Sequence, residues 1–298
     1  MQRSLSIITT CKGRLEHLKQ TLPRMIESGA YEVVVVDFSC PDGTAAYVSE
    51  HFPSVRVVSV EGQTYFSNWK ARNAGAAAAT SNLLVFCDAD TIVAERAVAW
   101  LRENLPPRNF GFLERAATLH FNKQGLPLAA NQLRGFHVVP AAAFRRASGY
   151  DELFEGYAAG ADTDLESRLS LLGLNGFSLD PSTIVEDVIQ HDNDDRMRHH
   201  RAPINVSYGT GLIYRIAKFA VLKNRRTAEL PLKTRRLIYK AASEAATRLQ
   251  VEDNTKMALT IAKEAIGMPR QLGFESAAIE VTLQVRVSGK DRIDKIPD

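Results

Sequence analysis

The feature that most constrains the fold is a regular alternation, over the first 90 residues, of short β-branched runs with segments of helical periodicity. Strands are expected at 5–10, 32–37, 55–60 and 83–88, and helices at 15–26, 43–51 and 67–79, the last with Ser67 as its N-cap. Because the valine-rich runs lack polar alternation, we expect a mostly parallel α/β sheet with helices on both faces.

The remaining residues divide into two further stretches. Up to residue 191 the expected elements are short and separated by glycine, with strands at 110–113, 136–139 and 182–189 and a helix at 162–172. Beyond residue 202 helices are expected at 206–223, 232–249 and 255–266, followed by a strand at 281–287. We therefore expect one α/β domain over residues 1–203 and a mainly helical extension over residues 204–298.

Charge follows a similar division. Residues 1–195 carry 17 Lys/Arg and 24 Asp/Glu, whereas residues 196–298 carry 20 Lys/Arg and 10 Asp/Glu, so the extension is basic. Val206, Leu212, Ile213, Ile216, Ala217 and Ala220 form an apolar helical stripe flanked by Arg215, Lys218 and Lys223. This pattern favours either contact with an anionic membrane surface or packing on another part of the protein or a second subunit.

Two observations exclude other classes of protein. Cys11, Cys40 and Cys87 form no CxxC pair, so neither a disulfide framework nor a thiolate zinc site is expected. No apolar run approaches the roughly 20 residues that cross a bilayer, and the first residues carry no small-residue cleavage site. We expect a cytoplasmic protein, with peripheral contact to the inner face of the membrane as an option.

The carboxyl ends of the expected strands are polar, and ligands of parallel sheets bind along that edge. The fourth strand ends in Asp88-Ala89-Asp90. Two neighbouring carboxylates repel each other unless a cation or proton lies between them, and oxygen ligands suit Mg²⁺ or Mn²⁺. The alternative is a solvated turn that caps a helix after Thr91.

Several motifs, taken in order, resemble those of a known family. Ala71-Arg72-Asn73-Ala74-Gly75, followed after an alanine-rich helix by Leu84-Val85-Phe86-Cys87-Asp88-Ala89-Asp90, resembles the nucleotide-sugar-binding half of GT-A fold glycosyltransferases of the family-2 type. The segments 5–14 and 33–39 fit the same pattern. Further on, 149–156 and 160–165 resemble the acceptor-side segment of galactosyl- and N-acetylgalactosaminyltransferase-like members. The resemblance covers about residues 4–195.

The resemblance implies roles for individual residues. Asp162 would be the general base, and Asp88, Asp90 and His191 would hold Mn²⁺ or Mg²⁺, with Asp88 contacting either the ribose or the metal. The donor would be bound by Thr9, Thr10, Arg14, Asp37, Ser39, Lys70, Arg72, Asn73, Asp88 and Ala89. Arg72 fits equally well as a helix-surface residue in a salt bridge. Ala161 stands where relatives have a glutamate, so the acceptor cannot be copied from them.

The implied activity is inverting, metal-dependent transfer of a hexose or N-acetylhexosamine from a nucleoside diphosphate sugar, with UDP as the favoured nucleotide. The acceptor would be a glycan or a lipid-linked molecule, which suggests polysaccharide biosynthesis. His199 and His200 belong to a basic segment that would help to cover the diphosphate. No nucleic-acid partner is expected, and a homo-oligomer remains an option.

Three other readings compete with this one. A haloacid dehalogenase-type phosphatase would use Asp88 as nucleophile and Asp90 as acid, but that family places this strand near the start of the chain. A nucleotidyltransferase would open with a glycine-rich loop, and the segment 10–14 holds one glycine. A non-enzymatic scaffold that uses the basic extension is the third alternative.

Overall fold

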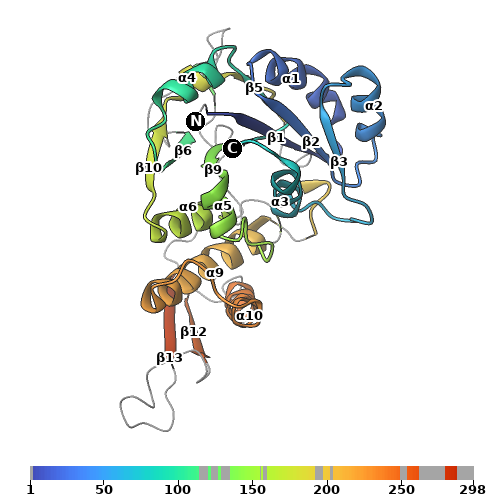
Figure 1. Cartoon of the computed structure of the whole chain (residues 1–298). Helices are drawn as coiled ribbons and strands as arrows, with labels where there is room; N and C mark the ends of the chain where they lie inside the picture. The colour runs from blue at the N-terminus through green and yellow to red at the C-terminus, as the bar shows by residue number, and fades with distance from the viewer. Residues whose placement is uncertain are drawn as a thin grey trace. The chain divides into compact units, whose positions relative to one another are not determined.

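The structure is a computed structural model that describes residues 3–113, 120–121, 127–128, 135–154, 156, 160–191, 197–201, 204–248, 254–261 and 279–286. Its chain forms two compact units (Figure 1). The first unit contains Met1–Glu152 and Arg168–Arg201, and the second contains Leu153–Ser167 and Ala202–Asp298. The division near residue 202 lies beside the domain boundary expected from the sequence, but the structure also assigns 153–167 to the second unit.

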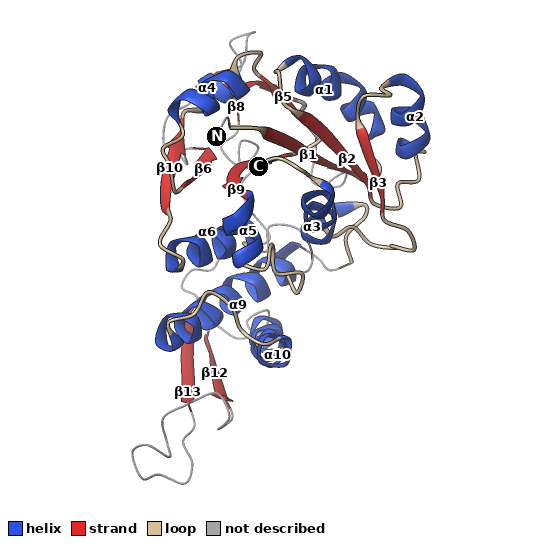
Figure 2. Ribbon diagram, viewed as in Figure 1, coloured by secondary structure: helices blue, strands red, loops and turns tan. Residues whose placement is uncertain are grey.

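The first unit is built on a seven-stranded sheet, drawn in red in Figure 2. In spatial order its strands are β10 (Asn175–Leu179), β6 (Asn109–Leu113), β9 (Phe136–Pro140), β4 (Leu83–Cys87), β1 (Leu5–Cys11), β2 (Glu32–Asp37) and β3 (Arg56–Ser59). Only β9 runs antiparallel to its neighbours in this sheet. The expected mostly parallel sheet is confirmed, and the carboxyl ends of β1, β2 and β4 therefore lie along one edge.

The helices predicted at 15–26, 43–51, 67–79 and 162–172 each begin and end within one residue of the prediction, whereas the helices at 97–104, 141–146 and 181–184 were not predicted. The described residues up to 191 contain the helices α1 (Leu15–Glu27), α2 (Thr44–His51), α3 (Asn68–Ala78), α4 (Ala97–Asn104), α5 (Ala141–Arg146), α6 (Ala161–Leu171) and α7 (Pro181–Ile184). Ser67 is the N-cap of α3, where its side chain accepts a hydrogen bond from the backbone N–H of Lys70.

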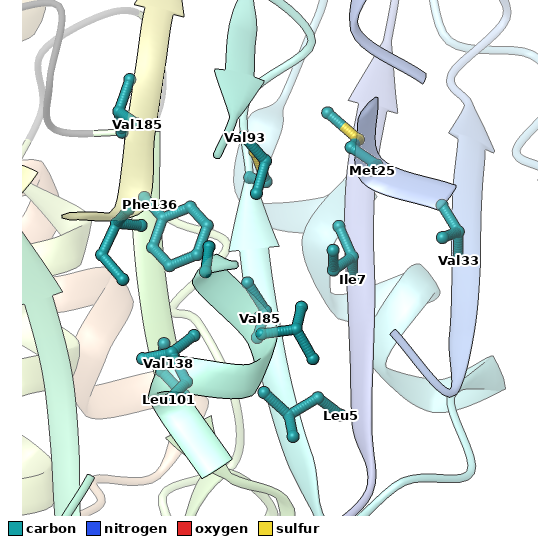
Figure 3. Close-up of a cluster of buried hydrophobic side chains, with 14 of the residues drawn as sticks. Leu5, Ile7, Met25, Val33, Val85, Val93, Leu101, Phe136, Val138 and Val185 are labelled. Carbon is teal, nitrogen blue, oxygen red and sulfur yellow. The ribbon is translucent and has the colours of Figure 1, made fainter. Parts of the chain in front are cut away.

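One face of the sheet packs on α1 and α4. Leu5 and Ile7 of β1, Val85 of β4 and Val138 of β9 are buried there, together with Met25 of α1 (Figure 3). Because helices cover both faces of the sheet, successive residues of its strands are buried alike, which explains the unbroken hydrophobic runs. On that face a Cβ atom at Gly75 of α3 would lie 2.4 Å from the Ile8 side chain, so glycine lets the helix approach the sheet closely.

Among the described residues of this part of the chain, four short strands lie outside the main sheet. β5 (Thr91–Val93) pairs antiparallel with β11 (Val185–Val188), and β7 (His120–Phe121) pairs with β8 (Pro127–Leu128). The strand expected at 182–189 is thus shorter than predicted, since its first residues form α7. Asp180 caps α7 by accepting a hydrogen bond from the Ser182 N–H. The strand β10 was not predicted.

The second unit contains two long helices and a β-ribbon. α9 (Ile204–Arg225) packs on α10 (Leu232–Arg248), and β12 (Asn254–Ile261) pairs antiparallel with β13 (Ile279–Arg286). The helix predicted at 255–266 is wrong over 255–261, where the structure has β12. From Met257 on, apolar Met257, Leu259 and Ile261 stand at every second position of that strand, and their register partners in β13 are the apolar residues Leu283, Val281 and Ile279. This period-2 pairing outweighs the helical spacing. Residues 262–266 lie outside the described residues, and β13 confirms the late strand.

The basic helix α9 is more deeply packed than its pattern suggested. Ile213 and Ala217 are buried as the stripe predicts, and Ile216 of the same stripe is 47% exposed. Lys218, expected as a flanking surface charge, is 1% exposed and pairs with Asp164 of α6 at 2.8 Å. Much of the apolar stripe therefore serves internal packing within the second unit.

Candidate active site

Asp90 and His191 lie in direct contact at the carboxyl edge of the sheet. His191 Nε2 is 2.7 Å from Asp90 Oδ2, although the two residues are 101 positions apart. The β5–β11 ribbon brings them together, since its pairing continues into a hydrogen bond from the Ile189 N–H to the Asp90 carbonyl (2.8 Å). Both side chains are mostly covered but not fully buried, at 17% exposure for Asp90 and 9% for His191.

Basic and aromatic groups surround this pair. The Arg14 guanidinium lies 3.8 Å from Asp90 Oδ2 and 3.4 Å from His191 Nδ1, and the His17 ring stacks on His191 with centroids 5.8 Å apart. Because arginine is a donor only, the Nδ1 atom accepts from Arg14, which leaves the Nε2 proton to be donated to Asp90. The sequence-predicted residues Arg14, Asp90 and His191 are thus brought together.

Asp88 is held in a different way. Its Oδ1 is 2.7 Å from the guanidinium of Arg72, a side chain that is 2% exposed. Arg72 also donates to Tyr150 Oη at 3.2 Å and lies among the rings of Trp69, Phe86 and Tyr150. The alternative placed Arg72 on the helix surface in a salt bridge: the salt bridge is present, with Asp88, but the surface position is wrong because the side chain is buried.

Gly135 leaves the space that the Asp88 carboxylate fills. A Cβ atom at this glycine would lie 2.3 Å from Asp88 Oδ2, and the Asp88 N–H donates to the Gly135 carbonyl at 3.0 Å. Ala89 between the two acidic residues is 7% exposed, and its carbonyl accepts from Thr21 at 2.8 Å. The turn that carries both carboxylates is therefore fixed from three sides.

The described residues contain no group of three or more His, Cys, Asp or Glu side chains arranged around a common ion. The chemistry of the donor set still fits a divalent cation, because Asp90 and His191 offer a carboxylate oxygen and an imidazole nitrogen at one point. Mn²⁺ accepts both ligand types, and the oxygens of a bound diphosphate and water are available to complete its coordination.

The residues expected around the nucleotide base divide into two kinds. Thr9 is buried, and its hydroxyl has no hydrogen-bond partner among the described residues, whereas the Thr10 hydroxyl donates to Asn68 Oδ1 at 2.9 Å. Asp37 accepts two backbone N–H bonds, from Cys40 and Ala45, each at 2.7 Å. Its carboxylate thereby fixes the turn that leads into α2.

Ser39 and Lys12 organise the loops beside Asp37. Ser39 adopts a left-handed backbone (φ 50°), and its hydroxyl donates to the Val60 carbonyl while accepting from the Gln63 N–H. The buried Lys12 ammonium donates to the carbonyls of Phe38, Ser39 and Gln63, at 3.2, 2.8 and 2.8 Å. Sequence reasoning missed Lys12, and a charged residue directly after a buried strand was the only available signal.

Asn73 forms hydrogen bonds with the turn that follows α5. Its Nδ2 donates to the Tyr150 carbonyl and to Glu152, both at 2.9 Å, and its Oδ1 accepts from the Tyr150 N–H. Lys70, one turn earlier on α3, is exposed. Of the three α3 residues expected along the nucleotide, Arg72 and Asn73 thus have internal partners, and only Lys70 extends into solvent.

Asp162 lies in the first turn of α6, within the second unit. Ala161, which stands where relatives have glutamate, is fully buried, and Asp164 is held by the Lys218 ammonium at 2.8 and 2.9 Å from its two oxygens. Asp162 is thus preceded by an alanine and followed, two residues later, by an aspartate that is already paired. Asp162 itself is half-buried.

His199 and His200 belong to the first unit and pack on its loops. The Phe66 N–H donates to the His199 carbonyl at 2.7 Å, and the His200 ring lies 5.9 Å from the Phe66 ring. Burial lowers the pKa of His200 to about 4, so its imidazole is neutral at pH 7. This segment contacts the loop after β1 as well, since a Cβ atom at Gly13 would meet the His199 ring.

The sequence of the chain was compared with those of known protein families and curated proteins. Residues 6–105 match the family model described as glycosyl transferase family 2. No curated protein sequence matches the chain. No helix in the described part of the chain is long and apolar enough to cross a membrane.

Three solved structures share the fold. The mannosyltransferase PcManGT from Pyrobaculum calidifontis, in complex with GDP-Man and Mn²⁺, is 15% identical with a TM-score of 0.51 over 84% of this chain and 75% of that one. S. aureus TarS 1-349 is 15% identical, with a TM-score of 0.52 over 83% and 72% of the two chains. GalNAc-T7 with UDP, GalNAc and Mn²⁺ is 15% identical, with a TM-score of 0.53 over 80% and 55%.

The sheet, its helices and the family match together define an enzyme class, and the protein is a glycosyltransferase of GT-A fold. Its family-2 region is the stretch from residue 6 to residue 105, which contains β1 to β4 and both strand-end carboxylates. The resemblance inferred from the motifs is thereby confirmed, and the phosphatase and scaffold readings are set aside.

Proposed function

We propose that the protein transfers a hexose or an N-acetylhexosamine from a nucleoside diphosphate sugar, with UDP as the nucleotide, to an acceptor hydroxyl. The reaction requires a divalent metal and inverts the anomeric centre. The observation that carries the proposal is the contact between Asp90 and His191, with Arg14 beside it, at the carboxyl edge of the sheet. Supporting it, two structures that share the fold hold a nucleotide or nucleotide sugar together with Mn²⁺.

In this proposal Asp90 and His191 hold Mn²⁺ or Mg²⁺, and Asp88 contacts the ribose or the ion. When bound, the ion neutralises negative charge on the diphosphate as the bond to the sugar breaks. Arg14 adds a fixed positive charge at the same place. Arg72 acts through Asp88, because its guanidinium fixes the orientation of that carboxylate.

The nucleotide base lies among Thr9, Thr10, Asp37 and Ser39 at the ends of β1 and β2, where the Thr9 side chain is fully buried. Asn73 shapes the site through the 149–152 turn, and Lys70 supplies a cation from solvent. Ala89 contributes backbone to the wall of the site. The UDP preference is carried by the sequence resemblance, since the fold is shared with a GDP-Man complex as well.

Asp162 is the general base that takes the proton from the acceptor hydroxyl as the oxygen attacks the sugar. Attack from the face opposite the diphosphate inverts the anomeric centre and forms no covalent intermediate with the enzyme. The acceptor is a glycan or a lipid-linked molecule, with polysaccharide biosynthesis as the process that such a transfer serves.

The second unit makes peripheral contact with anionic lipid. Ile216 of α9 and Leu232 and Leu237 of α10 are between 44% and 47% exposed, and Lys233 and Arg236 beside them are exposed cations. Each such cation near an anionic bilayer contributes about 1 kcal/mol of binding. Co-sedimentation with anionic and neutral vesicles tests this contact, and equal pelleting with both, at low salt, would exclude it.

A thermal-shift panel tests the donor class. UDP-sugars and GDP-sugars are added with and without Mn²⁺, because a ligand that binds only the folded protein raises its apparent stability. We expect a UDP-sugar with Mn²⁺ to give the largest shift, and Asp90→Ala to lose it. Glu103→Ala, an exposed carboxylate change on α4, is the matched control and keeps the shift. A panel without any metal-dependent shift would overturn the proposal.

A further inference from the structure

Two cysteines meet at the edge of the sheet where the donor site is proposed. Cys11 ends β1 and Cys40 lies in the loop between β2 and α2, and their Sγ atoms are 4.0 Å apart. Cys11 is fully buried, whereas Cys40 is partly exposed. Cys87, the third cysteine, is buried in the core. The first two therefore form a pair that a small oxidant can reach from one side.

The polar groups around the pair give the two sulfurs different roles. The Gly13 N–H donates to Cys40 Sγ at 3.1 Å, and the Thr44 hydroxyl donates to Cys11 Sγ at 3.2 Å. Either thiol can donate across the 4.0 Å contact, and when Cys11 donates its S–H, Cys40 carries the negative charge with the Gly13 N–H as a second donor. The start of α2 four residues later adds the positive end of a helix dipole.

The acidity of the two thiols follows from these contacts. The hydrogen bond from Cys11, with those from two backbone N–H groups, lowers the pKa of Cys40 to about 5. The same shared bond, together with burial, raises the pKa of Cys11. At neutral pH the pair is therefore one thiolate and one thiol, the arrangement of an attacking and a resolving cysteine.

We propose that Cys11 and Cys40 form a peroxide-sensitive dithiol that closes into an intrachain disulfide at the donor edge of the enzyme. The Cys40 thiolate attacks one oxygen of hydrogen peroxide, the O–O bond breaks, and the departing hydroxide takes a proton to become water. Cys40 is then a sulfenic acid. Cys11 Sγ attacks that sulfur, the S–S bond forms, and the S–O bond breaks. The leaving hydroxide takes the Cys11 proton and becomes the second water.

Closing the disulfide moves the loop that carries proposed donor residues. The sulfurs must approach from 4.0 Å to about 2.05 Å, the length of an S–S bond. The Cys40 N–H is bonded to Asp37, and its neighbour Ser39 already has a left-handed backbone. A shift of Cys40 therefore pulls on Asp37 and Ser39, and we expect weaker donor binding. This last step rests on the proposed function.

Differential alkylation of the full-length protein, followed by peptide mass spectrometry, tests the disulfide without any activity measurement. After hydrogen peroxide, we expect a Cys11–Cys40 linked peptide, loss of both free thiols in equal amounts, and an unchanged Cys87. Dithiothreitol should restore both thiols. Oxidation of Cys40 alone to sulfinic acid, equal reaction of all three cysteines, or a disulfide between chains would overturn the proposal.

Two variants assign the roles of the sulfurs. In Cys11→Ser the sulfenic acid on Cys40 has no resolving thiol and should be trapped by dimedone, whereas Cys40→Ser should give no adduct at Cys11. Dimedone labelling of Cys11 in Cys40→Ser would reverse the assignment and contradict the proposed order of attack. The alkylation experiment uses wild-type protein only, so it still tests the disulfide if either variant misfolds.

A thermal shift with UDP and Mn²⁺ then separates the disulfide from its effect on the donor. The shift should be present in reduced protein, lost after peroxide and recovered after dithiothreitol. A shift that oxidation leaves unchanged contradicts the coupling to the donor site. If reduced protein shows no shift, the proposed donor fails, while the peptide map still decides whether the dithiol exists.

Discussion

Asp88 and Asp90 end the same strand, yet the protein holds them in opposite ways. Asp88 is bound by Arg72, a cation that the fold buries completely among aromatic rings. Asp90 is bound by His191 and Arg14, which come from separate loops and remain partly exposed. The cation of the first pairing is part of the buried fold, although Asp88 itself is 37% exposed, whereas every member of the second pairing lies at the edge of the sheet where a ligand is proposed to bind. Two acidic residues of one Asp-x-Asp motif can therefore have different roles.

The largest expected effect concerns the stability of the first pairing. Arg72→Met removes the cation from a buried network and leaves Asp88 and Tyr150 without their partner. Removing one member of a buried pair costs on the order of 3 kcal/mol of unfolding free energy, at the lower end of the usual range because Asp88 is 37% exposed. Urea denaturation measures the loss. Lys70→Met, on the exposed side of the same helix, should change the stability by less than about 0.5 kcal/mol. Equal stability of the two variants would break the comparison.

The next largest effect is expected for Asp162, a carboxylate that belongs to neither pairing. Asp162→Asn keeps the shape of the side chain but cannot accept the acceptor proton, so we expect turnover to fall by roughly 10²-fold or more. That loss corresponds to about 2.7 kcal/mol in the activation free energy. Donor binding, measured by thermal shift, should stay close to wild type. Near-normal turnover of this variant would assign the base elsewhere.

A smaller effect is expected from His200, which packs on Phe66 rather than on the Asp90 pair. Burial lowers its pKa to about 4, while the unfolded chain keeps the ordinary value near 6.5. The unfolded state therefore takes up a proton first as the pH falls, and stability is lost between about pH 6.5 and pH 4. His200→Asn should lessen this pH dependence of the unfolding free energy, and His51→Asn, on exposed α2 surface, should not. Identical pH profiles for wild type and His200→Asn would contradict the buried, neutral imidazole.

The parts of the fold that local signals specify were predictable from the sequence. The strands β2 and β4 contain unbroken apolar runs, β1 is rich in β-branched residues, and α3 begins where Ser67 can cap it. The strand β12 was mistaken for a helix because its evidence lies in pairing with β13, 18 or more positions further along the chain. A single segment read alone does not show its partner.

The candidate site was predictable in its residue types and only partly in its contacts. The motifs pointed to Asp90, His191 and Arg14, and the structure brings the three together. The burial of Arg72 could not be read from its helix, because its partners Asp88 and Tyr150 come from other elements. The role of Lys12 was not predicted for the same reason. All three of its partners are backbone carbonyls of distant loops, which carry no sequence signal.

The central claim is that the partly exposed pair of Asp90 and His191 holds a divalent ion with the nucleotide. Isothermal titration of Mn²⁺ into wild type, Asp90→Ala and His191→Ala, each with and without UDP, tests it most directly, with Glu103→Ala as control. We predict tight Mn²⁺ binding only in the presence of UDP for wild type and Glu103→Ala, and its loss in the other two variants. Undiminished, nucleotide-dependent Mn²⁺ affinity in Asp90→Ala or His191→Ala would contradict the account.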